Sequence, residues 1–187
     1  MLRLTLLCHG PTGPAQQASF PADDPLDERC LPALAALRPH LSRADRSFTS
    51  PLLRARQTAE ALNLAARPEP GLRDLDLGCW QGRTLAEIHA GEPQAVEMWL
   101  ADPRAAPHGG ESRMELQTRI AGWLARLASS RGHTLCVTHA AVIRMAIIEV
   151  LGASADAFWR IDIEPLSRTC VTFDGRRWAV RTLNVTG

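Results

Sequence analysis

Short apolar runs alternate along the chain with segments in which apolar residues recur every three or four positions. The runs, bounded by proline, glycine or polar residues, predict β-strands at residues 2–7, 46–50, 134–138, 169–173 and 178–183. The helical spacing predicts helices at residues 27–41, 51–62, 84–90, 93–100, 111–127 and 140–151. Because strands alternate with helices, we expect an α/β fold, a three-layer α/β/α sandwich with a mainly parallel central sheet.

Local signals set the ends of several elements. Ser50 followed by Pro51 predicts a serine N-cap with proline at the first helical position. Glu111 is expected to cap or charge the start of the helix that follows it. Gly152 ends the apolar helix before it, and Asp174-Gly175 predicts a hairpin between the last two strands.

The chain has 187 residues, its 21 basic residues are all arginine, and its net charge is +1. This length suits one domain over residues 1–187. Without lysine there is no Schiff-base catalysis and no P-loop lysine, so a bound phosphate must be held by arginine, histidine, backbone N–H groups or metal. The near-neutral charge and the lack of a basic run predict binding neither to nucleic acid nor to a membrane.

Cysteine usage and the start of the chain bear on the compartment. The 5 cysteines are widely spaced and form no C-x-x-C pair, which predicts reduced thiols. The apolar stretch before His9 is too short for a signal peptide or a membrane span. We therefore expect a cytoplasmic protein.

Two of the predicted strands end in histidine, at His9 and at His139. Ligands gather at the carboxyl ends of strands in open α/β sheets, so both histidines face one crevice if their strands are neighbours. The helix after His139 presents a free N–H at Ala140 that favours an anion. Arg54, in the first turn after another strand, reaches the same edge. Each residue taken alone also fits a structural role, as a core histidine or an exposed helix arginine.

Six motifs occur in an order that is typical of one family. They are Cys8-His9-Gly10, Asp24-Pro25-Leu26, Ser50-Pro51-Leu52-Leu53-Arg54-Ala55-Arg56-Gln57-Thr58, Leu72-Arg73-Asp74-Leu75-Asp76-Leu77-Gly78-Cys79-Trp80-Gln81-Gly82, Gly109-Gly110-Glu111-Ser112 and Val137-Thr138-His139. With these motifs the chain resembles the histidine phosphatase, or phosphoglycerate mutase-like, superfamily over nearly its whole length. The resemblance implies the phosphoglycerate mutase-like fold and the phosphomonoester hydrolase activity of the small phosphatases in that family.

The resemblance also implies a covalent mechanism without metal or cofactor. His9 would attack the phosphorus of a small phosphorylated metabolite and become phosphohistidine, and water would then release phosphate. Asp74, where small phosphatases of this type carry glutamate, would protonate the leaving oxygen. The nearby Asp76 is the competing acid.

The same resemblance implies a set of substrate-binding residues. Arg54, His139 and the Ala140 N–H would hold the phosphoryl oxygens, where charge builds up in the transition state. Cys8 and Gly10 flank the nucleophile and complete this set, with Gly10 letting the backbone approach closely.

The sequence departs from the family pattern at Cys8, where the family has an arginine that binds phosphate. One charged hydrogen bond is worth roughly 1.5–3 kcal/mol, so its loss would slow the reaction by about one to two orders of magnitude. Three arginines are candidates to replace it: Arg83, Arg113 and Arg144.

Two further functions stay open. A chain without the first-motif arginine also fits a degenerate family member that binds a phosphorylated ligand with little or no turnover. Phosphoglycerate mutase-type phosphotransfer is a lesser alternative, because such mutases are longer and carry extra segments that shield the phosphohistidine from water, which we do not expect in this compact chain.

Two other classes are excluded. Cys170 and Arg176 flank a hairpin turn rather than the phosphate loop of a cysteine phosphatase, and no motif supplies a third zinc ligand.

The substrate is expected to be a small organic phosphate. Two segments would select it, the proline-rich loop at residues 11–25 and residues 84–108. The oligomeric state stays open, with a homodimer as a candidate.

Overall fold

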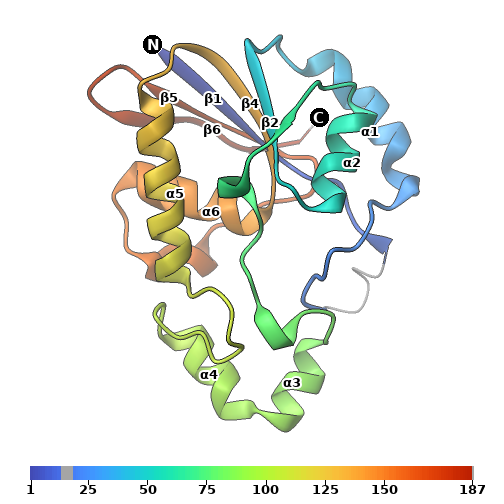
Figure 1. Ribbon diagram of the computed structural model, residues 1–187, viewed down its shortest axis with the longest axis vertical. Helices are drawn as coiled ribbons and strands as arrows, with labels where there is room; N and C mark the ends of the chain where they lie inside the picture. The colour runs from blue at the N-terminus through green and yellow to red at the C-terminus, as the bar shows by residue number, and fades with distance from the viewer. Residues whose placement is uncertain (14–18, 187) are drawn as a thin grey trace.

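A computed structural model describes residues 1–13 and 19–186 of the chain. In these residues a six-stranded sheet runs in the order β3-β2-β4-β1-β5-β6 (Figure 1). Its strands are β1 (Leu2–Cys8), β2 (Arg46–Thr49), β3 (Arg67–Pro68), β4 (Gly132–Thr138), β5 (Arg168–Phe173) and β6 (Trp178–Val185). The first four are mutually parallel along the sheet, β5 is antiparallel to β1, and β5 and β6 form the predicted hairpin.

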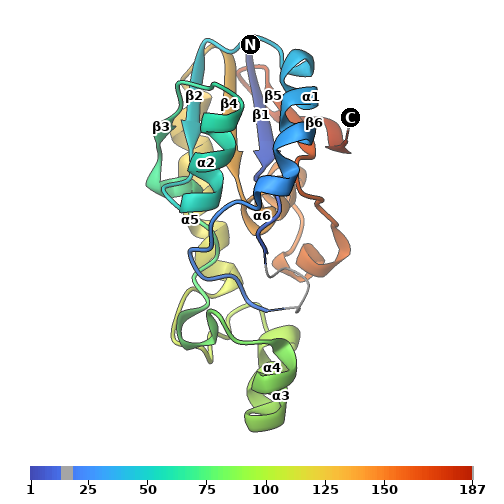
Figure 2. The same ribbon diagram turned by 90° about the vertical axis from the view of Figure 1, so that its right-hand side faces the viewer.

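Helices cover both faces of the sheet, which confirms the predicted sandwich (Figures 1 and 2). The α1 and α2 helices pack on one face and the α5 and α6 helices on the other, while α3 and α4 lie beyond the carboxyl ends of the parallel strands. Their bounds are α1 (Leu31–Leu37), α2 (Leu53–Ala61), α3 (Leu85–Gly91), α4 (Pro93–Ala101), α5 (Arg113–Ala128) and α6 (Ala140–Leu151).

The β1 strand is buried on both faces, which explains its nearly continuous apolar sequence. Leu4 and Leu6 belong to the core cluster with α5 and α6, and Leu7 belongs to the cluster with α1 and α2. Cys8 pairs with Thr138 of β4 in parallel register. The strands that carry the two histidines are therefore neighbours, as expected, and they end at the same level.

The helix predicted for residues 27–41 is shorter than expected. The α1 helix spans only Leu31–Leu37, and a turn of 3₁₀ helix stands on each side of it, Glu28–Cys30 before it and Arg38–His40 after it. Pro39 accounts for the change at the end, because proline has no N–H to donate and its ring clashes with the preceding α-helical turn.

The predicted start of the second helix is wrong by two residues. Leu52 is the N-cap, in extended backbone conformation, and α2 begins at Leu53 rather than at Pro51. Ser50 lies outside the helix, and its hydroxyl oxygen accepts a hydrogen bond from the Leu52 backbone at 3.2 Å. Ser50 is thus free for another partner, described below.

The start of α5 also differs from the expectation for Glu111. Ser112 is the N-cap, and it forms a capping box with Glu115, in which each side chain bonds the backbone N–H of the other. Glu111 takes no part in this cap.

The remaining segments are mostly irregular. Residues 66–82 contain β3 and two 3₁₀ turns, and a further 3₁₀ segment spans Ala155–Arg160. Of the loop at residues 11–25, residues 14–18 lie outside the described residues. In the part of the chain that the structure describes, no helix has the length and apolar character needed to cross a bilayer.

Candidate active site

His9 and His139 meet at the carboxyl edge of the sheet, directly after β1 and β4. Their ring centroids are 5.0 Å apart with the planes at 61°. The His9 backbone N–H donates to the carbonyl of Thr138 at 2.9 Å, which ties the two strand ends together. The two histidines therefore lie side by side at this edge, where His9 lines a cavity described below and His139 is fully buried.

The partners of His9 decide which of its ring nitrogens carries the proton. Nδ1 lies 2.6 Å from the Gly10 carbonyl oxygen, which can only accept, and Nε2 lies 3.2 Å from Nε–H of Arg54, which can only donate. The proton therefore sits on Nδ1, and Nε2 carries the free electron pair. Burial and the positive charge of Arg54 lower the pKa of His9 below its ordinary value, so the ring is neutral.

Gly10 ties the turn after β1 to α2. Its N–H donates to the Thr58 hydroxyl at 3.0 Å, and this hydroxyl donates to the Arg54 carbonyl at 2.7 Å. A Cβ at Gly10 would stand 2.6 Å from a terminal methyl group of Leu26, so any other residue here would require that side chain to shift. This packing holds His9 against α2, while the role of Gly10 in substrate binding stays a prediction.

Arg54 is the hub of the site. Its side chain is 1% exposed, and each of its three nitrogens has a partner. Besides the contact of Nε with His9, Nη1 donates to the Ala22 carbonyl at 2.7 Å and Nη2 donates to Oδ2 of Asp74 at 2.6 Å. The first turn of α2 thus places a guanidinium between the nucleophile candidate and the acid candidate.

Asp74 lies opposite both histidines. Its Oδ1 accepts from the Leu75 N–H at 2.9 Å, and its Oδ2 lies 3.4 Å from Nδ1 of His139. Burial raises the pKa of Asp74, but its contact with Nδ1 of His139 and the charge and hydrogen bond of Arg54 lower it by more, so the net pKa lies below the ordinary value. The carboxyl group is therefore ionised when no substrate is bound.

His139 is fully buried and neutral, and Ser50 orients it. Burial lowers the pKa of His139 to about 3, and its Nε2 lies 2.7 Å from the Ser50 hydroxyl. The Asp74 carboxylate faces Nδ1, which favours the proton there, so the Ser50 hydroxyl donates to Nε2. Nδ1 forms no hydrogen bond with any described residue and points its proton into the site.

Ser50 was missed as a site residue because its sequence signal fits a helix cap. The observed role depends on the neighbouring strand β4, which local sequence does not report.

A second residue that the sequence analysis missed is Arg119, on α5. It forms a two-pronged ion pair with Glu111, with N–O distances of 2.8 and 2.7 Å. It also donates to the carbonyls of Gly71 and Asp74, at 2.8 and 3.3 Å. Glu111 therefore does not cap its helix but fixes the arginine that holds the turn bearing Asp74. A signal was present, because Arg119 follows Glu111 by about two helical turns.

Two adjoining cavities share Arg54 and Asp74. The first has a volume of about 260 Å³ and is lined by His9, Ala140, Ala141, Arg144 and Phe158. The second has a volume of about 290 Å³ and a more polar lining that includes Asp23, Arg73, Asp76 and Gln81. The first two residues of α6 therefore line the same cavity as the nucleophile candidate, and the N–H groups at a helix N-terminus suit an anion.

The structure places the three candidate replacement arginines in different surroundings. Arg83 pairs with Glu92 at 3.2 Å, and Arg113 is buried with its Nη2 on the Trp99 carbonyl at 2.9 Å. Only Arg144 of the three lines the cavity that contains His9.

Neither Cys8 nor Asp76 is among the residues that line the cavity next to His9. Burial raises the pKa of the Cys8 thiol to about 12, so it is neutral, and a part in substrate binding stays a prediction. Oδ1 of Asp76 accepts from the Gly78 N–H at 2.9 Å and from the Gln81 amide at 3.1 Å, which stabilises the local turn.

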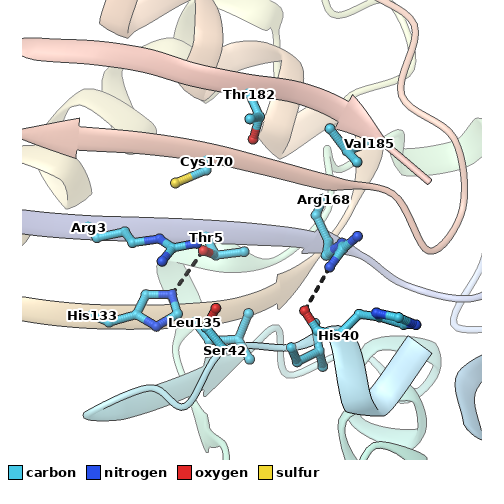
Figure 3. Close-up of a pocket in the computed structure, with 11 residues that line it drawn as sticks. Arg3, Thr5, His40, Ser42, His133, Leu135, Arg168, Cys170, Thr182 and Val185 are labelled. Carbon is cyan, nitrogen blue, oxygen red and sulfur yellow. Dashed lines mark hydrogen bonds between the residues drawn. The ribbon is translucent and has the colours of Figure 1, made fainter. Parts of the chain in front are cut away.

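A separate pocket of about 210 Å³ contains none of the candidate site residues (Figure 3). His133 points toward the Thr5 hydroxyl there, at 2.9 Å, and Arg168 donates to the His40 carbonyl at 2.9 Å. Among residues 1–13 and 19–186, no group of three His, Cys, Asp or Glu side chains is placed to hold a metal ion.

Known proteins resemble this chain in sequence and in fold. The sequence model of the histidine phosphatase superfamily (branch 1) matches residues 4–186. Phosphoserine phosphatase 1 of Hydrogenobacter thermophilus is 27% identical over 197 residues, which cover 100% of this chain and 93% of that protein. Glucosyl-3-phosphoglycerate phosphatase of Mycolicibacterium vanbaalenii is 34% identical over 178 residues, which cover 82% of this chain and 76% of that protein. The crystal structure of the α-ribazole phosphatase from Shigella flexneri has a TM-score of 0.88 at 24% identity, covering 98% of this chain and 96% of that one.

Proposed function

Because the chain belongs to the histidine phosphatase superfamily (branch 1), we propose that it hydrolyses a small phosphorylated metabolite through a phosphohistidine on His9. The observation that carries the proposal is the unprotonated Nε2 of His9, whose electron pair faces the Arg54 guanidinium in a cavity that Asp74 also lines. The reaction needs no metal or cofactor, and a single domain over residues 1–187 performs it.

In the first step, Nε2 of His9 attacks phosphorus. The N–P bond forms as the P–O bond to the leaving group breaks, and Asp74 gives its proton to the leaving oxygen. Asp74 must gain this proton first. A bound phosphate places negative charge next to the carboxyl group, which raises its pKa and favours protonation.

The oxygens of the transferred group are held by donors that the site presents in fixed positions. Arg54 supplies its guanidinium, His139 its Nδ1–H, and α6 the N–H of Ala140.

In the second step water attacks the phosphohistidine while the Asp74 carboxylate takes the proton of that water. The N–P bond breaks, its electrons return to Nε2, and inorganic phosphate leaves.

The two cavities support a division of the substrate into two parts. The cavity next to His9 would take the phosphoryl group, and the polar cavity beyond Asp74 would take the organic group that leaves. Their small volumes suit a metabolite. Phosphoserine phosphatase 1 and glucosyl-3-phosphoglycerate phosphatase, which are named for such substrates, support the same size class.

The test is an assay of the purified protein on a panel of phosphomonoesters in the presence of a metal chelator. We expect phosphate release and an acid-labile phosphoenzyme from the wild type, and neither from His9→Ala. His89→Ala, which removes an exposed histidine on α3, is the matched control and should match the wild type.

The alternatives give different results in the same assay. Binding of orthovanadate without hydrolysis of any ester would contradict the enzyme and favour a binding protein, the reading that the neutral thiol of Cys8 supports. Transfer of the phosphoryl group to an added phosphoglycerate in preference to water would favour a mutase.

A further inference from the structure

The charges that line the cavity next to His9 do not by themselves balance a phosphate. Arg54 and Asp74 form an ion pair at 2.6 Å, so their charges cancel before a substrate arrives. His9 and His139 are held neutral by burial. A phosphoryl group with two negative charges therefore needs a further cation. In the described part of the chain, Arg144 is the remaining charged side chain that lines this cavity.

Arg144 stands on α6, one turn after Ala140, whose N–H is the first of the helix and faces the Cys8 sulfur. Residues one turn apart on a helix lie on the same face. The arginine and the N-terminal N–H group of the helix therefore lie on the same side of the cavity, where an anion can reach both.

Protein contacts hold one side of the Arg144 side chain, and its Nη atoms remain available. Its Nε donates to the Ile161 carbonyl at 2.6 Å, and its guanidinium lies over the Phe158 ring at 5.5 Å. Its Nη2 is 3.7 Å from Asp162, a carboxylate that is 96% exposed to solvent, so this pair is weak. Within the described residues neither Nη atom donates a hydrogen bond, which leaves two donors for an anion.

The same cation acts on the position where the first motif lacks one. Cys8 lies at the end of β1, next to His9, and its buried thiol carries no charge. The positive charge of Arg144 is felt at this thiol, more strongly than that of Arg54. Arg144 on α6 is therefore close enough to serve the place that a side chain from β1 would otherwise serve.

We propose that Arg144 binds the phosphoryl group that is transferred to His9, and that its charge stands in for the arginine that the first motif lacks at Cys8. This inference rests on the proposed function, since it assigns a second guanidinium to the same phosphate site. It moves one phosphate ligand from the β1 strand to the α6 helix.

The test measures anion binding and turnover separately. Calorimetry with inorganic phosphate and with orthovanadate gives binding, and kcat/KM on the best ester of the panel gives turnover. We expect Arg144→Gln to weaken anion binding and lower kcat/KM by roughly 10- to 100-fold, and Arg144→Lys to lose less. Arg160→Gln, which removes an exposed arginine of the same neighbourhood, should behave as the wild type.

A second variant separates the charge of Arg144 from its packing. Cys8→Arg restores a cation from the strand side, so the double variant Cys8→Arg/Arg144→Gln should recover most of the lost binding and turnover. Recovery is expected only if the charge matters, because the bond to Ile161 stays broken in the double variant.

The outcomes distinguish the two proposals. If the wild type turns over and Arg144→Gln binds phosphate and turns over equally well, the role of Arg144 is overturned and the phosphatase stands. If the wild type binds orthovanadate without hydrolysing any ester, the phosphatase fails, and weaker binding by Arg144→Gln still supports the role of Arg144. A folded Arg144→Gln that the double variant does not rescue also overturns it.

Discussion

The Ser50 hydroxyl lies 2.7 Å from Nε2 of His139, and it fixes the proton of that ring on the side that faces the site. Replacement by alanine removes the donor and lets the proton move to Nε2, away from the phosphate. We expect Ser50→Ala to lower kcat/KM about 5- to 30-fold, the equivalent of about 1–2 kcal/mol for one lost hydrogen bond.

Nitrogen NMR of the His139 ring checks this directly, because it distinguishes the two tautomers. Ser129→Ala, at an exposed position after α5, is the control and should change neither the tautomer nor the rate. A Ser50→Ala variant with wild-type kcat/KM would show that the hydroxyl does not orient the ring.

Asp74 and Asp76 should differ sharply when each is changed to asparagine. Asp74→Asn loses the proton donor, so its rate should fall by about 100-fold or more for alkyl phosphates, whose leaving oxygens need a proton, and less for aryl phosphates. Asp76→Asn changes only a turn contact to Gly78 and Gln81 and should keep most of the activity. Measuring kcat across leaving groups of graded acidity checks both, and an equal loss in the two variants would assign the acid differently.

The acid side of the pH profile follows from His9. Its pKa is lowered by burial and by Arg54, so the neutral nucleophile persists below the ordinary value of 6.5, and kcat/KM should fall only at more acidic pH. Arg54→Gln removes the positive charge and should raise the pKa of His9. NMR titration of the ring measures this without turnover. An unchanged pKa in Arg54→Gln would contradict the assigned cause.

Stability should decrease in acid because His139 is buried without charge. Its pKa is about 3 in the folded chain and near 6.5 when unfolded, so the unfolded chain binds the extra proton between these values. The free energy of unfolding is therefore retained above pH 6.5 and falls as the pH drops toward 3, at up to about 1.4 kcal/mol per pH unit. Urea unfolding at several pH values measures this slope. His139→Gln should flatten it, and an equally steep slope in that variant would assign it to other groups.

The ion pair between Arg119 and Glu111 should support both stability and catalysis. Arg119→Met leaves Glu111, which is 8% exposed, without its partner and releases the Asp74 carbonyl. We expect a loss of about 2–4 kcal/mol in unfolding free energy together with a lower kcat. Arg126→Met on the same helix, at a side chain that is 68% exposed, is the control. Full activity in Arg119→Met would mean that the turn holds Asp74 unaided.

The parts of the site that the sequence predicted are those with a local signature. His9 and His139 follow apolar strands, and a strand pattern predicts both the element and the edge at which it ends. The parts that it missed depend on contacts between distant segments. The hydroxyl of Ser50 meets a ring 89 residues away, where the local rule favours a helix cap. Arg119 reaches carbonyls 45 to 48 residues before it, which no periodicity along α5 reports.

The same limit applies to the fold. Alternating strands and helices identified the sandwich, since each element carries its own pattern. The ends of the helix at residues 27–41 were misplaced because a 3₁₀ turn and an α-helix bury leucines at similar spacing. Pro39, rather than the leucine pattern, marks where α1 stops.

The hydrogen bond from Arg54 to the Ala22 carbonyl connects residues 21–23, which line the second cavity, to the guanidinium that would bind the anion. The Arg54 guanidinium contacts both His9 and the Ala22 carbonyl, so an arriving phosphate competes for a group that already holds the Ala22 backbone in place. Affinity for the anion and the position of this segment are then linked, and each must alter the other by the same free energy. The position of residues 21–23 would thus depend on whether an anion is bound at Arg54.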